Sequence, residues 1–185
     1  MVDYEKHFRR YCEDTNLSIN LSFDMPEGYE TANGTFDLTV NTLFINKEML
    51  QSKPEYEKMF YLFHELRHAL QYLHPERFDE LIARSRLYVI QYDGTCYKLV
   101  AGDWKECKLD GSIEYFTELY LGQPYEQDAN DFAYEKVKEF LGDSPELHEL
   151  HAFWTPKKPI SDQTYEDLYR QIDEITGETS RETSR

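Results

Sequence analysis

The sequence predicts an α+β fold, in which a small antiparallel sheet packs on a helix and a mainly helical C-terminal portion follows. Three observations lead to this fold class. Apolar and polar residues alternate with a period of two between residues 17 and 46, as they do in strands. From residue 54 onward the apolar residues recur at helical spacing. Residues 88–111 interrupt the helices with Asp-Gly and Ala-Gly-Asp turn signals, which indicate an inserted β-hairpin.

The N-terminal part of the chain supplies the sheet and the first helices. Residues 3–14 are expected to form an amphipathic helix, because aromatic side chains recur there at helical spacing. Strands bounded by turn residues are expected over 17–23, 35–40 and 42–46. Helices are expected over 54–73 and 75–87, the second beginning at Pro75 because proline suits the first turn of a helix.

The C-terminal part is expected to be helical. The hairpin should span about residues 88–108, and helices should follow over 112–121, 124–141, 144–152 and 162–175. Pro124 and Gly142 mark the start and the end of the longest of these helices. Because the last residues repeat ETSR, we expect a flexible tail over 177–185 after a single domain over 1–176.

Composition limits the partners and the compartment. The chain has 36 acidic and 20 basic residues and a net charge of -16, which argues against nucleic acid as a direct partner and favours a basic protein. The N-terminus has no apolar signal region, and no window approaches the roughly 18 apolar residues of a membrane span, so we expect a cytoplasmic protein with no membrane partner. Cys96 and Cys107 are expected to face each other across the hairpin as buried free thiols.

The stretch FYLFHELRHALQYLH places two histidines on one face of the helix over 54–73. With His64 at zero on a helical wheel, His68 falls at roughly 40°, whereas the apolar residues fall between roughly 140° and 260°. The two imidazoles therefore point together away from the apolar arc, one turn apart, so that both can bind one tetrahedral Zn²⁺. Glu65 lies beside them, where it reaches a water at the metal rather than the metal itself. This is the His-Glu-x-x-His arrangement of zinc peptidases.

A catalytic zinc site needs a third protein ligand. The stretch PYEQDANDFAYEKV offers Glu126, with Asn130 four residues later on the same face to orient a ligand histidine through a hydrogen bond. Asp128, on a different face of that helix, is the alternative ligand. His148 and His151 form a rival pair for a metal, although no third ligand accompanies them in the sequence.

The stretches TLFINKEML, FYLFHELRHALQ and YEQDANDFAYE, in this order, resemble the ImmA/IrrE family of metallopeptidases, whose members cleave helix-turn-helix repressors of mobile elements or of DNA-damage genes. The resemblance covers about residues 35–141. It implies a zincin-like fold and one Zn²⁺ per chain, held by His64, His68 and Glu126. It also implies that Glu65 is the general base.

Three features depart from the family pattern. Arg67 stands where the family usually has Gly, and it could narrow the cleft. The interval from His68 to Glu126 is longer than usual, which is consistent with an insertion over 88–108 that shapes substrate choice. No helix-turn-helix domain is recognisable in the chain, so a repressor would be a separate protein, whose basic DNA-binding face the acidic chain would attract.

The expected function is that of a zinc-dependent endopeptidase with a narrow protein substrate, such as a transcriptional repressor of a phage, another mobile element or a stress regulon. An extended substrate would pair with the edge of the 17–46 sheet. Tyr72, His74 and His151 are the candidates for oxyanion or substrate contacts. Two rival functions stay open: a non-catalytic binding protein, with zinc or without metal, that sequesters a regulator, and a zincin of another branch.

Overall fold

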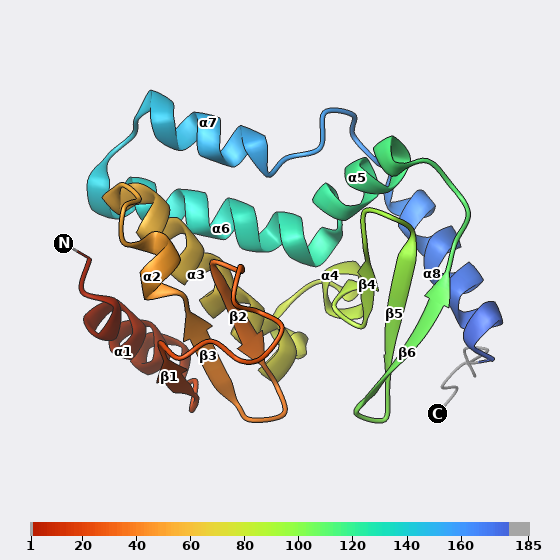
Figure 1. Ribbon diagram of the computed structural model, residues 1–185, viewed down its shortest axis with the longest axis horizontal. Coiled ribbons are helices and arrows are strands. Elements are labelled where there is room, and N and C mark those ends of the chain that lie inside the picture. Colours follow the sequence, from red (N-terminus) through yellow and green to blue (C-terminus); the bar gives the residue numbers. More distant parts are fainter. Residues whose placement is uncertain (1, 178–185) are drawn as a thin grey trace. The chain divides into compact units, whose positions relative to one another are not determined.

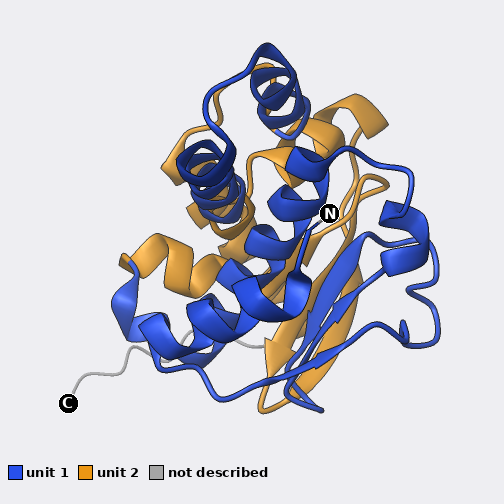
Figure 2. Ribbon diagram, turned by 90° about the vertical axis from the view of Figure 1, so that its left-hand side faces the viewer, with its two compact units in different colours: residues 1–78, 127–154 blue, residues 79–126, 155–185 orange. Residues whose placement is uncertain are grey.

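The computed structural model describes residues 2–177 and has an α+β fold, as the sequence predicts (Figure 1). The chain divides into two compact units (Figure 2). Unit 1 comprises residues 1–78 and 127–154, and unit 2 comprises residues 79–126 and 155–185. The expected tail over 177–185 lies outside the described residues, except for Gly177. None of the helices formed between residues 2 and 177 combines the length and the apolar character that crossing a bilayer requires.

Unit 1 contains the first sheet and the helices around it. In chain order its elements are α1 (Tyr4–Thr15), β1 (Asn20–Ser22), β2 (Gly34–Asp37), β3 (Thr42–Ile45), α2 (Lys47–Leu50), α3 (Glu55–Leu73), the 3₁₀ turn η1 (Pro75–Arg77), most of α6 (Pro124–Leu141) and α7 (Pro145–Phe153). Side chains from both faces of α3 and from the sheet form one core, in which Leu43, Ile45, Phe60 and Leu66 are fully buried.

The sheet of unit 1 is mixed, so the expectation of an antiparallel sheet is wrong for one of its strands. The strand order is β1-β3-β2, with β2 antiparallel to β3 and β1 parallel to β3. A tight turn joins β2 to β3, whereas residues 23–33 carry the chain from β1 past the central strand to the opposite edge. Because the chain reverses direction between β1 and β2, and again between β2 and β3, β1 runs in the same direction as β3.

Helix α3 begins and ends where the sequence predicts. Pro54 precedes it, and the backbone amide of His74 bonds to the carbonyl of Leu70 at its C-terminal end. The expected apolar arc is buried, but the opposite face is also covered, because His68 and Gln71 have exposed fractions of 7% and 0%. The part of α6 that belongs to unit 1 covers this face, and its Asp128 bonds to side chains of α3.

Unit 2 contains a second sheet with helices packed on it. Its elements are α4 (Glu80–Ser85), β4 (Tyr88–Ile90), β5 (Thr95–Val100), β6 (Asp103–Lys108), α5 (Ile113–Leu121) and α8 (Asp162–Thr176). The expected hairpin is β5-β6, and β4 extends it to an antiparallel sheet. Ala101 and Gly102 turn the hairpin with positive φ values of 51° and 93°, as a two-residue turn of this hand requires.

Two further expectations, for the cysteines and for the helix over 75–87, can be compared with the structure. Cys96 and Cys107 are direct partners across β5 and β6, and both are buried and free, which confirms their expected state. The helix expected over 75–87 is wrong, because the chain forms η1, breaks, and then begins α4 at Glu80. Phe78 is extended, and the Asp79 carboxylate caps the new helix by accepting a hydrogen bond from the amide of Ile82.

Candidate metal centre

His64 and His68 lie one turn apart on α3, and their side chains meet. The two Nε2 atoms are 2.9 Å apart, and the rings stand edge to face with 4.4 Å between their centroids. Two nitrogens bound to one tetrahedral zinc at about 2.05 Å would lie about 3.3 Å apart. Small rotations of the two side chains therefore suffice for both nitrogens to bind one ion, as their spacing in the sequence predicts.

Glu126 lies in the first turn of α6, one residue before the part of that helix that belongs to unit 1. A ligand atom from each of His64, His68 and Glu126 lies within 4.8 Å of the other two. Across residues 2–177 this is the one group of three or more His, Cys, Asp or Glu side chains close enough to hold a metal ion. Two imidazole nitrogens and a carboxylate oxygen are donors that Zn²⁺ commonly takes in catalytic sites, so these residues fit the metal that the sequence predicts.

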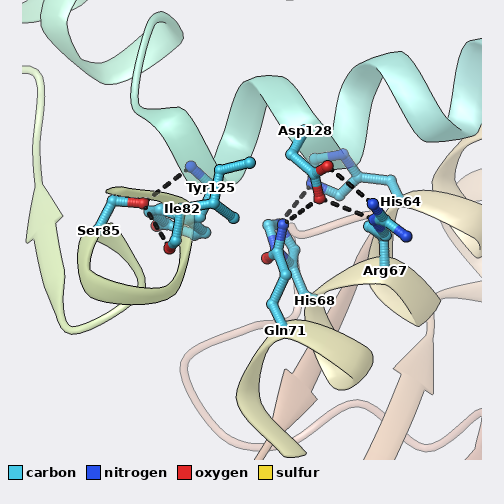
Figure 3. Close-up of polar contacts among 8 residues, drawn as sticks. All are labelled: His64, Arg67, His68, Gln71, Ile82, Ser85, Tyr125 and Asp128. Atoms are coloured by element: carbon cyan, nitrogen blue, oxygen red, sulfur yellow. Dashed lines mark hydrogen bonds and ion pairs between the residues drawn. The ribbon is translucent and has the colours of Figure 1, made fainter. Parts of the chain in front are cut away.

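Asp128, the alternative ligand, is engaged elsewhere. Its carboxylate accepts two hydrogen bonds from the Arg67 guanidinium, at 2.7 Å from Nε and 2.8 Å from the terminal nitrogen (Figure 3). It also accepts a hydrogen bond of 2.8 Å from the Gln71 amide nitrogen. Burial acts to lower the pKa of Arg67, but the hydrogen bonds and the charge of Asp128 outweigh it, so that the pKa is raised. The arrangement favours Glu126 over Asp128 as the third ligand.

Arg67 does not extend into solvent as a long exposed side chain would. Its guanidinium lies over the rings of Phe78 and Phe132, 4.5 Å and 4.8 Å from their centroids, and its side chain is 23% exposed. The residue that departs from the family pattern is therefore turned towards α6 and Asp128, because the ion pair and the two rings hold it there.

Gln71 is a residue of this site that the sequence analysis did not identify. Its amide oxygen lies 2.8 Å from Nδ1 of His68, while its amide nitrogen bonds to Asp128 (Figure 3). The signal was present in the sequence, since Gln71 falls at roughly 340° on the wheel that places His64 at zero. A fully buried glutamine on the histidine face of a helix needs partners for both of its polar atoms.

Glu65 is half-buried and lies against the edge strand β2. A Cβ atom added to Gly34 would come within 2.9 Å of the Glu65 Cγ atom and within 3.0 Å of the Phe44 carbonyl oxygen. The absence of a side chain at Gly34 thus leaves room for Glu65 between the strand and the histidine face of α3.

The remaining candidate residues have other neighbours. Asn130 is buried, and its amide nitrogen donates to the Trp154 carbonyl at 3.3 Å, so its expected hydrogen bond to a histidine stays a prediction. Tyr72 packs beside Phe36, with 6.3 Å between ring centroids. His74 lies at the end of α3, with its Nδ1 atom 3.1 Å from Glu76.

The rival pair of histidines lies on α7. The Nε2 atom of His148 is 2.9 Å from the carboxylate of Asp143, and that of His151 is 2.7 Å from the carboxylate of Asp131. Each histidine thus faces a different acid, and the two do not belong to a metal-binding group among the described residues. For His151, the expected role in substrate contact stays a prediction.

Comparisons with family models, with curated proteins and with solved structures gave no match to this chain.

Proposed function

We propose that this chain is a zinc-dependent endopeptidase of the ImmA/IrrE type, with a zincin-like arrangement of sheet and helix and a narrow protein substrate. The proposal rests on one observation: the ligand atoms of His64, His68 and Glu126 lie within 4.8 Å of one another. Glu65 lies on α3, the helix that carries the two histidines. Together they supply three protein ligands and a separate carboxylate, which is the composition of a hydrolytic zinc site.

In this proposal the residues have distinct roles. His64, His68 and Glu126 would hold the ion, and the bound zinc supplies a Lewis acid that polarises a carbonyl oxygen and acidifies a water molecule. The Glu65 carboxylate would serve as the general base, accepting a proton from the attacking water at one of its oxygens and passing it to the leaving amine nitrogen. The contact of Glu65 with β2 at Gly34 restricts where its carboxylate can lie, which supports a role in positioned proton transfer.

Strand β2 is an edge of the sheet in unit 1, and it lies against Glu65. An extended peptide added to this edge would use backbone hydrogen bonds to hold its register, as strand addition does in many peptide-binding proteins. The net charge of -16 supports a basic substrate, and a DNA-binding repressor has such a surface. The proposed substrate is therefore a separate basic repressor that offers an extended segment.

The first test measures metal content. Elemental analysis of the purified wild-type protein should give about one zinc per chain, and His64→Ala and Glu126→Ala should each lose it. His148→Ala, which alters the rival pair on α7, should keep it. A wild-type protein that takes up no zinc after reconstitution would contradict the proposal, and zinc lost only from His148→Ala would move the site to α7.

The second test separates an enzyme from a binding protein that holds zinc. Cells that produce the wild-type protein or Glu65→Gln are compared by mapping new protein N-termini. The enzyme should generate a small set of cleavages in DNA-binding proteins, absent with Glu65→Gln although zinc is still bound. Glu139→Gln, an exposed substitution of the same kind on α6, should leave the cleavages unchanged. Biological activity that persists in Glu65→Gln would support the binding protein instead.

A further inference from the structure

We infer that Gln71 and Asp128 are positioning residues that fix the protonated nitrogen of His68 at Nδ1, so that its Nε2 lone pair is available to a cation. This inference deepens the proposed function and rests on it only for the identity of the cation. We call the hydrogen-bonded series Arg67, Asp128, Gln71 and His68 the relay. All four residues lie in unit 1, on α3 and on the part of α6 that begins at Gln127.

The argument begins with Asp128, because an ionised carboxylate can only accept hydrogen bonds. The bidentate ion pair with Arg67, at 2.7 Å and 2.8 Å, engages both oxygens of this carboxylate and fixes its plane. The nitrogen of the Gln71 amide must therefore face Asp128, at a distance of 2.8 Å. The reversed amide would bring two acceptor oxygens together in a buried place, which costs free energy.

The orientation of the amide then determines the tautomer of His68. With its nitrogen towards Asp128, Gln71 presents its oxygen to Nδ1 of His68, 2.8 Å away. An amide oxygen only accepts, so Nδ1 must carry the proton, and the neutral ring keeps its lone pair on Nε2.

The contact between the two histidines agrees with this assignment. The Nε2 atoms of His64 and His68 are 2.9 Å apart, a distance at which one nitrogen donates and the other accepts. If His68 is protonated at Nδ1, its Nε2 is the acceptor and His64 is the donor. The two rings should therefore be opposite tautomers without metal, and both should carry the proton on Nδ1 when their Nε2 atoms bind zinc.

Arg67 and its aromatic neighbours keep the relay in place. The guanidinium lies over the rings of Phe78 and Phe132, and both contacts favour its present position. The chain Arg67 to Asp128 to Gln71 to His68 thus links a fixed cation to the ligand nitrogen through three sets of hydrogen bonds. Residues that orient a metal-binding histidine in this way typically contribute 10–100-fold to metal affinity.

The experiment reads the tautomer directly. Protein labelled with ¹⁵N-histidine is studied by long-range ¹H–¹⁵N correlation spectra at about pH 8, where histidine side chains are mostly neutral. In the metal-free wild-type protein, His68 should show a proton on Nδ1 and no proton on Nε2. In Gln71→Met, which keeps the length of the side chain and removes both polar atoms, His68 should show a mixture of tautomers or a protonated Nε2. Gln163→Met, at an exposed position on α8, is the matched control and should leave the spectrum unchanged.

Zinc affinity is measured on the same proteins by competition with a chromophoric chelator. Gln71→Met should bind zinc about 10–100-fold more weakly than the wild-type protein, and Asp128→Asn should show a loss in the same direction. Thermal melts of the metal-free variants show that each is folded. If Gln71→Met does not fold, the wild-type spectrum still decides, since a proton on Nε2 of His68 would overturn the inference.

The outcomes separate this inference from the proposed function. A protonated Nδ1 in a wild-type protein that takes up no zinc would support the relay and contradict the zinc enzyme. Normal zinc binding with an unchanged tautomer and unchanged affinity in Gln71→Met would overturn the relay and leave the zinc site intact.

Discussion

The substitution Asp128→Ala tests the ion pair that links α3 to α6. It removes the acceptor of two hydrogen bonds from Arg67 and of one from Gln71. The two charged side chains are only 23% and 15% exposed, so solvent replaces the lost carboxylate poorly. Removing one partner of a buried ion pair costs about 3–5 kcal/mol, and the partial exposure of this pair places the expected loss at the lower end, about 3 kcal/mol.

The loss is measured by thermal unfolding. For a chain of this size each kcal/mol corresponds to about 2–4 °C, so the Tm of Asp128→Ala should fall by about 9 °C. The control is Asp167→Ala, which breaks an ion pair with Arg170 on α8 whose side chains are 57% and 65% exposed. An exposed pair of this kind contributes about 0.5 kcal/mol, so the Tm should change by at most about 2 °C.

The double variant Arg67→Met/Asp128→Ala completes the test. Because it removes the buried cation together with its partner, its loss of stability should be smaller than the sum of the two single losses by about 1–3 kcal/mol. If Asp128→Ala lowered the Tm no more than Asp167→Ala does, or if the two single losses simply added, the reasoning that couples these residues would be refuted.

Three further predictions concern other parts of the molecule. Gly34→Ala should destabilise the fold by about 1–3 kcal/mol, because the new Cβ meets Glu65 and backbone, and adding Glu65→Ala should restore part of the loss in a chemical denaturation experiment. For Asp93, hydrogen bonds from the backbone amide of Thr95 and from the side chains of Lys108 and Thr95 lower the pKa from 3.8 to about 2. The stability that it contributes is therefore present above about pH 4 and is lost as the pH falls through 2, so the Tm difference between the wild-type protein and Asp93→Asn should vanish over that range. Cys96 and Cys107 should react with iodoacetamide far more slowly in the folded than in the denatured protein, because burial raises the pKa of both thiols, that of Cys96 to about 12.

Each of these predictions has a result that would contradict it. The prediction for Gly34 would be contradicted if Gly34→Ala and the double variant Gly34→Ala/Glu65→Ala were equally unstable. The Tm difference produced by Asp93→Asn would have to persist unchanged at pH 2. Mass spectrometry would have to find Cys96 labelled in the native protein before Cys12, which is the more exposed thiol.

Most of the longer helices could be predicted from the sequence because they carry their own periodicity and end signals, whereas the short helix α2 was not predicted. Helix α6 begins at Pro124 and ends before Gly142, as expected. Helix α3 buries most of the apolar residues that its periodicity placed on one face. The direction of β1 could not be predicted in this way, since an alternating pattern is the same in parallel and antiparallel strands. Pro75 indicated the start of a helix but not its length, because the extended residue Phe78 and the capping Asp79 determine the break.

His64 and His68 could be predicted from their spacing, and Glu126 from the pattern of zinc peptidases with Asp128 as an alternative, but the residues that support these ligands could not. His64, His68 and Glu126 come together as the motif implies. The partners of Asp128 depend on which face of α6 covers α3, and that is decided by packing between segments about 60 residues apart. Gln71 could have been identified from its position on the wheel, whereas its bond to Asp128 could not.

The bidentate pair also constrains how this sequence can change during evolution. A substitution that removes the charge at position 67 leaves the largely buried carboxylate of Asp128 without its cation, and one that removes the acid at position 128 leaves the largely buried guanidinium of Arg67 without its anion. Either single substitution costs about 3 kcal/mol of the free energy of unfolding, which is a large part of the stability of an ordinary domain, so selection should act against it. Positions 67 and 128 should therefore covary in lineages related to this chain, with a small residue at 67 accompanied by a neutral one at 128.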